Sequence, residues 1–223
     1  MIHKLRIDSV ELEFKLRKIL SAIFMKCTTH EIVGLLGRNG EGKTCLMNVI
    51  LGNLKASNSF ISFDDVKVTE AFKKPQLLMY LPQFNFIPAS LKLCAVFGDF
   101  GLDYAWFENK FPEFGMRYQS RVKELSGGQR RLLEIYVIAK SPTMFVMLDE
   151  PFTHLNPLQI EKVKSFLKEE KINKGIIITD HMYNHILDIS DRIYILANGK
   201  THLMESKTDL DRLGYAKVID LYK

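Results

Sequence analysis

The stretch Glu31-Ile-Val-Gly-Leu-Leu-Gly37-Arg-Asn-Gly-Glu-Gly-Lys-Thr44 runs from an apolar segment into a glycine-rich loop. Its last eight residues fit the pattern G-x-x-x-x-G-K-[ST], in which loop N–H groups and a helix N-terminus surround phosphate groups. That pattern requires a strand before the loop and a helix after it, and residues 31–36 and 43–51 suit both roles. We therefore expect a phosphate-binding loop rather than a glycine-rich turn with an incidental Lys-Thr pair.

Two side chains of this loop suit phosphate chemistry directly. Lys43 can reach the β- and γ-phosphates of a nucleotide, and the Thr44 hydroxyl can bind Mg²⁺. The remaining candidate contacts to the nucleotide are Gly37, Arg38, Asn39, Gly40, Glu41, Gly42 and Cys45.

Apolar and helical stretches alternate along the chain on both sides of the loop. The strand-like runs are residues 31–36, 77–81, 144–148, 175–179 and 192–196, and helical stretches cover 43–51, 157–170 and 182–187. Such alternation is typical of parallel strands joined by crossover helices. Residues 1–30 and 60–68 suggest short strands with polar turns, while 90–110 and 127–139 suggest helices. The expected fold is α/β, with a mixed sheet and a helical excursion.

Two acids follow the apolar run at residues 144–148. Asp149 and Glu150 would lie at the carboxyl end of a buried strand, where ligand chemistry collects in open α/β sheets. Asp149 can hold Mg²⁺, often through water, and Glu150 could polarise the water that attacks a γ-phosphate. The alternative is two acids in an ordinary loop, which the phosphate loop upstream disfavours.

The segment Leu125-Ser-Gly-Gly-Gln129 precedes a helical pattern. Ser126 and Gln129 have the spacing of a capping box, which is a purely structural role. Two consecutive glycines at a helix start also expose N–H groups to an anion, so the segment could hold a second phosphate. The residues alone leave both interpretations open.

In this order, the three motifs resemble the ABC ATPase family, and the resemblance covers nearly the whole chain. Further family elements follow in order: Tyr80-Leu-Pro-Gln83, Leu155-Asn-Pro157 and Thr179-Asp-His181. The resemblance implies an α/β P-loop NTPase fold with a RecA-like core, an antiparallel β subdomain and an inserted helical subdomain. It also implies one domain over residues 1–223, with the helical subdomain at about 84–140.

The resemblance assigns roles to further residues. Gln83 would sense Mg²⁺ and the attacking water, and His181 would contact the γ-phosphate. Phe14 would stack on adenine, although it could equally be the inward face of a strand at residues 12–16. By the same resemblance, the ATP of the opposite protomer would be contacted by Ser126, Gly127, Gly128 and Gln129. The active site would then be complete only in a dimer.

The function implied by the resemblance is that of an ATP-hydrolysing ABC transporter subunit. A homodimer, or a heterodimer with a related ATPase, would close around two ATP–Mg²⁺ and drive a separate membrane permease. The phrases at residues 31–37, 149–152 and 178–181 are most similar to bacterial ATPases such as the lipopolysaccharide-export subunit. The alternative is a soluble ABC ATPase acting on nucleic acid or ribosomes. Chromosome-maintenance relatives have a long coiled coil in this part of the chain, whereas the stretch between Thr44 and Ser126 carries no heptads.

Composition fits a cytoplasmic protein at a membrane. No run approaches the eighteen apolar residues of a spanning helix, and the charged residues 1–14 do not resemble a signal peptide. Three widely spaced cysteines suit neither a disulfide framework nor a metal site. The formal net charge of +5 does not demand nucleic acid as a partner. The family resemblance further implies a peripheral position on the inner face of the cell membrane, and we expect no direct nucleic-acid binding.

Three residues depart from the family pattern. Cys45 replaces a second hydroxyl residue after the lysine, Asn156 replaces the usual acid before Pro157, and His30 replaces a glycine before Glu31. We expect Cys45 to weaken nucleotide binding and Asn156 to alter communication between the two ATP sites. His30 should reshape the turn in which it lies. None of these changes removes a catalytic group, so an active ATPase is expected.

Two further expectations concern metal and partner binding. His181 and His185 have helical i, i+4 spacing, but Met182 stands where the H-E-x-x-H signature has its glutamate, so zinc is not expected. Residues 84–97 are too apolar for a purely solvated surface. About half of them should serve the core, and the rest should form a groove for a permease helix.

Overall fold

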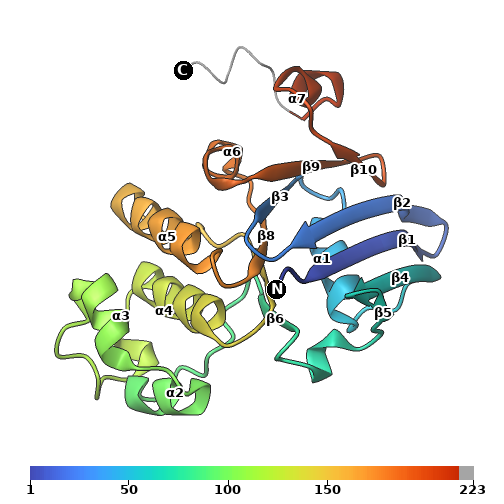
Figure 1. The fold of residues 1–223 in the computed structure, drawn as a ribbon. Helices are drawn as coiled ribbons and strands as arrows, with labels where there is room; N and C mark the ends of the chain where they lie inside the picture. Colours follow the sequence, from blue (N-terminus) through green and yellow to red (C-terminus); the bar gives the residue numbers. More distant parts are fainter. Residues whose placement is uncertain (216–223) are drawn as a thin grey trace.

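One ten-stranded sheet organises residues 1–215, which are the residues that this computed structural model describes (Figure 1). The strands are β1 (Lys4–Phe14), β2 (Arg17–Thr28), β3 (Ile32–Leu36), β4 (Asn58–Phe63), β5 (Val66–Lys67), β6 (Leu78–Leu81), β7 (Phe145–Asp149), β8 (Gly175–Thr179), β9 (Arg192–Ala197) and β10 (Lys200–Leu203). The helices are α1 (Lys43–Leu51), α2 (Leu93–Phe100), α3 (Tyr104–Lys110), α4 (Gly127–Lys140), α5 (Pro157–Glu170), α6 (Tyr183–Ile189) and α7 (Thr208–Arg212). The sheet order is β5-β4-β1-β2-β10-β9-β3-β8-β7-β6.

The parallel part of the sheet runs β9-β3-β8-β7-β6. Strands β3, β7 and β8 are buried along their whole length because elements cover both faces. In β7, Val146 and Leu148 pack with α4, α5 and α6, whereas Phe145 and Met147 pack with α1 and with strands β1 and β2. Burial on both faces explains the continuous apolar runs of these strands, and it confirms the expected α/β fold.

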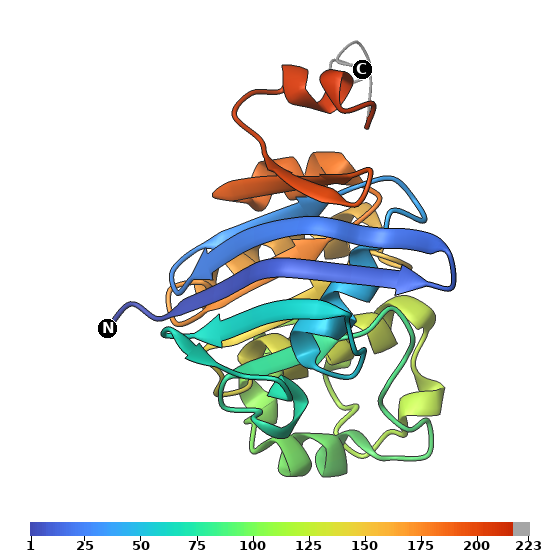
Figure 2. The same ribbon diagram turned by 90° about the vertical axis from the view of Figure 1, so that its right-hand side faces the viewer.

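The antiparallel part consists of β1, β2, β4 and β5, which lie in front of the parallel strands in Figure 2. The prediction of short strands in residues 1–30 was wrong, because β1 and β2 are long and continuous. Within β1 the exposed Glu11 and Glu13 alternate with the buried Val10 and Leu12, so the strand continues through these charged residues. A register shift at Ser9 lets β1 continue past a bulge instead of ending there.

Helices α2, α3 and α4 are inserted between β6 and β7. The helix expected over residues 90–110 is broken in two, because Gly101 ends α2 in the left-handed conformation with φ 62°. Phe107 of α3 lies at the centre of an aromatic cluster, with ring centroids 4.4–5.4 Å from those of Phe97, Phe111, Phe114 and Tyr136. Because Tyr136 belongs to α4, this cluster fixes α4 against the inserted helices.

The turn between β2 and β3 accommodates His30 through its backbone. His30 has φ 72°, in the left-handed region that glycine enters without steric cost, and its N–H donates to the Lys174 carbonyl at 3.1 Å. The departure from the family glycine therefore leaves a well-formed turn.

The helices of residues 1–215 are short. The longest, α4 and α5, have 14 residues each, and none of the helices in this range is long and apolar enough to cross a membrane.

Candidate nucleotide site

The loop between β3 and α1 has the conformation of a phosphate cradle. Gly42 lies directly before α1 with φ 101°, and a Cβ atom there would lie 2.7 Å from the Ile19 side chain. Only glycine fits such a position, so the tight approach of the loop to β2 explains why the sequence has Gly42. The loop therefore presents the N-terminus of α1, with its free N–H groups, to an anion.

Lys43 is buried inside the curl of this loop. Its Nζ donates to the Gly37 carbonyl at 2.6 Å and to the Arg38 carbonyl at 3.3 Å. Burial lowers the pKa of Lys43, while the nearby carboxylates of Glu150 and Asp149 act to raise it. A cation held by neutral carbonyls can exchange them for phosphate oxygens when a nucleotide binds.

Asp149 ends β7 and is fully buried. Its Oδ2 accepts a hydrogen bond from the Tyr80 hydroxyl at 3.0 Å, and its Oδ1 has no hydrogen-bond partner in the described residues. Burial raises the pKa of Asp149, and the nearby Thr44 and Tyr80 hydroxyls oppose that rise. An unpartnered buried carboxylate oxygen beside the Thr44 hydroxyl is a suitable ligand pair for Mg²⁺, which prefers few protein oxygens together with phosphates and water. These residues therefore fit the metal.

Glu150 occupies a strained position next to Asp149. It has φ 49°, and its N–H donates to the Thr179 carbonyl at 2.9 Å. Its carboxylate lies 3.8 Å from Nδ1 of His181, which in turn lies 3.3 Å from Oδ1 of Asp180. Strain of this kind persists only where surrounding contacts hold it, and it gathers at functional sites.

These elements surround one cavity of about 400 Å³. Its lining residues are Arg17, Ile19, Asn39, Gly40, Gly42, Lys43, Thr44, Cys45, Gln83 and Glu150. Six of the nine predicted contacts in Gly37–Cys45 thus lie together with Gln83 and Glu150, which come from distant parts of the sequence. The other three loop residues make contacts that hold the loop: the Gly37 and Arg38 carbonyls accept from Lys43, and Glu41 accepts from the N–H of Asn198, in the turn between β9 and β10, at 2.9 Å.

Phe14 lies at the end of β1, outside the lining of this cavity. It pairs across the hairpin with Arg17, which does line the cavity. Its side chain is 49% exposed, which excludes the interpretation of Phe14 as a core residue. The ring is therefore free to contact a ligand that extends from the cavity.

The segment Ser126–Gln129 is also outside the cavity, at the start of α4. Both hydrogen bonds of the capping box are present, at 3.2 Å and 3.0 Å, so the structural role of Ser126 and Gln129 is confirmed. A Cβ atom on Gly128 would lie 2.9 Å from the His154 carbonyl, which explains the second glycine by close packing. Asn156 makes an equivalent capping box on α5, so it replaces an acid without loss of the helix cap.

Two residues to which the sequence assigned no role, Tyr80 and Asp180, hold parts of the site by hydrogen bonds. Tyr80 binds Asp149, and the fully buried Asp180 accepts from the N–H groups of Phe152 and Met182 at 3.1 Å and 2.9 Å. Both residues stand in quoted motifs, but a motif does not reveal which backbone groups a side chain will reach. Arg17 had no sequence signal, because its place depends on the hairpin between β1 and β2.

The alternative of a zinc pair has no structural basis. His181 precedes α6, which begins at Tyr183, and the His185 ring packs against Phe152 with centroids 5.6 Å apart. Within residues 1–215 no three His, Cys, Asp or Glu side chains are placed to hold a metal ion together.

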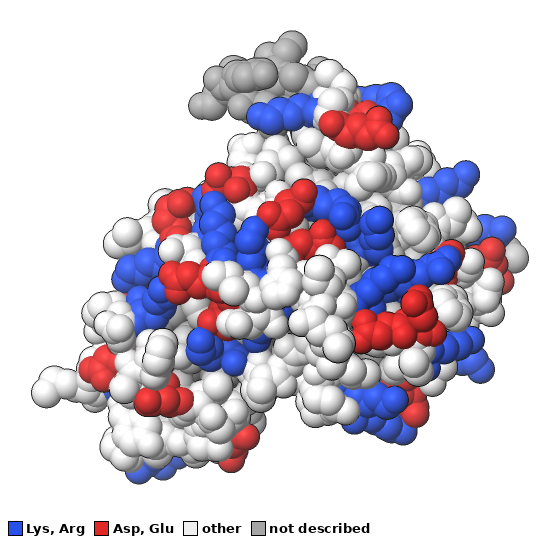
Figure 3. Space-filling view, viewed as in Figure 1, with Lys and Arg blue, Asp and Glu red and all other residues white. Residues whose placement is uncertain are grey.

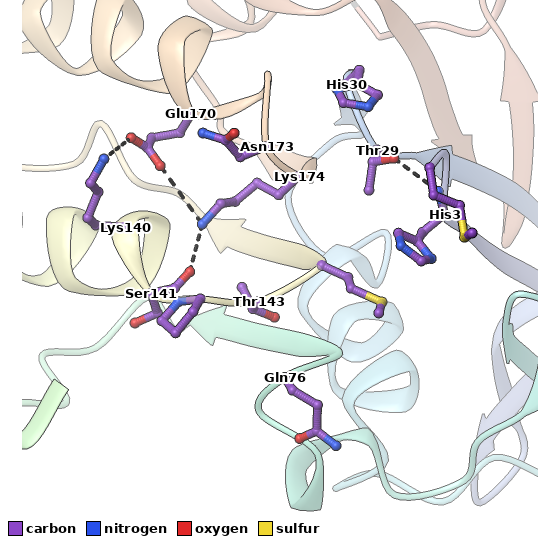
Figure 4. A pocket seen from close by; sticks show the side chains of 13 residues that line it. His3, Thr29, His30, Gln76, Lys140, Ser141, Thr143, Glu170, Asn173 and Lys174 are labelled. Carbon is purple, nitrogen blue, oxygen red and sulfur yellow. Dashed lines mark hydrogen bonds and ion pairs between the residues drawn. The ribbon is translucent and has the colours of Figure 1, made fainter. Parts of the chain in front are cut away.

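A second polar cavity of about 510 Å³ lies at the opposite, amino-terminal edge of the parallel strands (Figure 4). Its buried cation, Lys174, donates to the Ala139 and Ser141 carbonyls at 2.6 Å and 2.7 Å and lies 3.9 Å from Glu170. Burial lowers the pKa of Lys174 to about 8. Lys140 binds the same glutamate at 2.7 Å. The charges are thus already paired, and none of the predicted site residues lines this cavity.

Comparisons with known proteins agree with this geometry. A family model described as "ABC transporter" matches residues 20–153. The chain is 29% identical over 209 residues to the lipopolysaccharide export system ATP-binding protein LptB of Haemophilus influenzae, with 86% of each chain covered. An ATP-binding subunit of an ABC transporter superposes with a TM-score of 0.79 at 22% identity, covering 98% of this chain and 97% of that chain. A bacterial Atm1-family ABC exporter with ATP bound superposes with a TM-score of 0.81 at 17% identity, and the superposition covers 100% of this chain and 42% of that chain.

Replacing Lys43 tests the phosphate loop. Lys43→Ala should weaken ATP binding by at least about tenfold, which corresponds to about 1.4 kcal/mol, because Lys43 is the cationic side chain of the loop that lines the cavity, whereas Arg38 lies outside the lining. Titration calorimetry measures the affinity, with the exposed Lys55→Ala as the matched control. Parental affinity in Lys43→Ala would place the phosphate site elsewhere.

Replacing Phe14 tests the proposed adenine contact. Phe14→Ala should weaken ATP binding by up to about 1–3 kcal/mol if the ring stacks on the base, with little change in melting temperature because the ring is half exposed. The fully exposed Leu16→Ala on the same hairpin is the control. Unchanged affinity in the Phe14 variant would remove this residue from the site.

Proposed function

Because this chain belongs to the ABC transporter family, we propose that it hydrolyses ATP in the 400 Å³ cavity and thereby drives a membrane permease. One observation carries this assignment: Lys43 and Thr44 of the phosphate loop line the same cavity as Gln83 and Glu150. The cavity therefore combines groups that bind phosphate with a carboxylate that can activate water. The proposed domain spans residues 1–223, with a helical subdomain at about 84–140.

The proposed chemistry assigns a task to each side chain. Lys43 holds the β- and γ-phosphates, and Glu150 accepts the proton of the attacking water and orients it. We assign to His181, which lies 3.8 Å from Glu150 just outside the cavity lining, a contact to the γ-phosphate that it would report to that carboxylate. Gln83, in the cavity lining, is the proposed second group that orients the water.

Thr44, Asp149 and Gln83 are the proposed holders of Mg²⁺. Their support is the unpartnered Asp149 Oδ1 and the position of the other two side chains in the cavity lining. Bound Mg²⁺ would neutralise charge that develops on the β- and γ-phosphates. Cys45, also in the lining, supplies a thiol where a hydroxyl is usual, so we expect a weaker contact to the nucleotide at that position.

We assign the second half of each site to another copy of the chain or to a related ATPase. Ser126, Gly127, Gly128 and Gln129 lie at the N-terminus of the 14-residue helix α4, outside the cavity of their own chain. Their N–H groups and the helix dipole can hold the γ-phosphate bound by a partner chain. ATP would then act as the bridge between two chains, and hydrolysis would release them.

The permease should dock in an apolar groove of about 410 Å³ beside the site. Its lining includes the aromatic residues Phe72, Phe84, Phe86 and Phe100. Phe84 is 71% exposed, as expected of a docking surface, whereas Phe97 and other parts of the segment are buried in the core. Thr44 and Gln83 line both this groove and the nucleotide cavity. Through these two side chains, a movement of the permease in the groove can affect the bound nucleotide, and the nucleotide can affect the groove.

We propose a cytoplasmic location at the inner face of the cell membrane, in keeping with the role of the relatives named above. The alternative of a soluble ABC ATPase on nucleic acid has less support. On the face drawn in Figure 3, Lys and Arg side chains are interspersed with Asp and Glu, rather than gathered into the basic stripe that phosphate backbones attract.

Glu150→Gln tests the catalytic assignment. The amide keeps the shape of the side chain but cannot accept a proton, so ATP binding should persist while turnover falls by at least about 100-fold. Size-exclusion chromatography with ATP should show a trapped dimer. The exposed Glu161→Gln serves as the control, and parental turnover in the Glu150 variant would refute its role.

Polar substitutions at Phe84 and Phe86 test the docking groove. Phe84→Ser with Phe86→Ser should strongly reduce co-purification with the membrane permease, because the apolar anchors of the groove are lost. ATP affinity should stay near the parental value. Trp106→Ser, an equally exposed aromatic outside the groove, is the control. Intact association in the double variant would exclude this surface from the interface.

A further inference from the structure

Arg131 is the largest fully buried polar side chain of the described residues, with 2% of its surface exposed. It lies in the second turn of α4, two residues after Gln129. Arginine is almost never fully buried unless its charge and donors are matched, so a buried guanidinium indicates a strong local requirement.

Four backbone carbonyls satisfy this guanidinium. Nη1 donates to Pro82 at 2.8 Å, and Nη2 donates to Asp149 at 2.7 Å and to Glu150 at 3.0 Å. Nε donates to Pro151 at 3.4 Å. The planar fork of arginine can reach several acceptors at fixed angles, which a flexible ammonium cannot do.

These four carbonyls belong to two loops of the catalytic edge. Pro82 follows β6 and directly precedes Gln83, while Asp149 ends the neighbouring strand β7 and Glu150 and Pro151 follow it. Glu150 has φ 49° and needs such support to keep its conformation. Arg131 therefore ties the backbone that carries Gln83 to the backbone that carries Glu150.

Neighbouring side chains of α4 hold the other end of the Gln83 loop. Arg130 donates to the Ile87 carbonyl, and the buried Glu134 accepts from the Ile87 N–H at 3.4 Å. Glu134 also lies 3.7 Å from Arg131, so the two buried charges compensate each other. One face of α4 thus holds residues 82 and 87, which bracket Phe84 and Phe86 of the docking groove.

We propose that Arg131 is a positioning residue for ATP hydrolysis. It holds the backbone of Gln83 and the backbone of Glu150 in a fixed relative position, and it thereby couples the docking groove to the catalytic carboxylate. The inference rests on the proposed function of Glu150. A displacement of about 1 Å in a catalytic group can cost about 100-fold in rate, so loss of this brace should lower turnover. Nucleotide affinity should change little, because Arg131 is not in the cavity lining.

Separating positioning from stability requires a compensated variant. Arg131→Met removes one of the two cations beside the buried Glu134 and leaves only Arg130, whose Nε lies 3.4 Å from that carboxylate, so the variant should lose stability regardless of any effect on Glu150. Arg131→Met with Glu134→Gln removes the carboxylate that has lost part of its compensation, while the glutamine oxygen can still accept from the Ile87 N–H. This double variant should recover at least half of the lost melting temperature.

The experiment compares kcat, KM for ATP and melting temperature in purified full-length variants. Arg131→Met should lower kcat by about 10- to 100-fold with KM within about threefold of the parent, and the compensated double variant should keep the low kcat. Arg131→Lys should have an intermediate kcat, because one ammonium reaches fewer carbonyls. Arg192→Met, which removes an arginine bound to Glu31 at 3.1 Å far from the site, is the matched control.

Recovery of kcat together with melting temperature in the double variant would overturn the proposal, since Arg131 would then act only through stability. A kcat within threefold of the parent in Arg131→Met, or a changed KM with parental kcat, would do the same. If the parent hydrolyses ATP and Glu150→Gln stops it, these outcomes overturn the role of Arg131 alone. A parent insensitive to Glu150→Gln would overturn the proposed function and this inference with it.

Discussion

The parallel hydrogen bonding of β3, β8, β7 and β6 is the constraint on which the candidate site depends. Parallel strands end at the same edge of a sheet, so the loops that follow them must meet there. The phosphate loop follows β3, Gln83 follows β6, Glu150 follows β7 and His181 follows β8. Lys43, Gln83 and Glu150, of which the first and last are more than a hundred positions apart in the sequence, therefore line one cavity, and His181 lies beside Glu150 at 3.8 Å.

Buried polar side chains then fix the loops at this edge. Asp180 accepts hydrogen bonds from the backbone of the loops after β7 and β8, and Arg131 donates to four carbonyls at the ends of β6 and β7 and in the loops that follow them. Each of these groups would be costly to bury without its partners, so each contact holds both the side chain and the loop. The aromatic cluster around Phe107 adds to this order, because it holds α4, which carries Arg131 and the segment proposed to meet a second chain.

The sequence supported the α/β fold and the phosphate loop well, because apolar runs and the Gly-Lys-Thr pattern are local features with a direct physical meaning. It failed for the length of β1, which continues because the exposed Glu11 and Glu13 alternate with the buried Val10 and Leu12. It also could not foresee the role of Arg131, since hydrogen bonds to backbone carbonyls depend on tertiary position rather than on neighbouring residue types. The end of an apolar strand pointed to Asp149 and Glu150, whereas the roles of Gln83, His181 and Phe14 came from family resemblance.

The most direct test of the account is a crystal structure of the Glu150→Gln chain with ATP and Mg²⁺. The account predicts that Lys43 Nζ leaves the Gly37 carbonyl, now 2.6 Å away, for the β- and γ-phosphates, and that Ser126 of a second chain contacts the same nucleotide. A nucleotide bound away from Lys43, or one enclosed by a single chain alone, would contradict it.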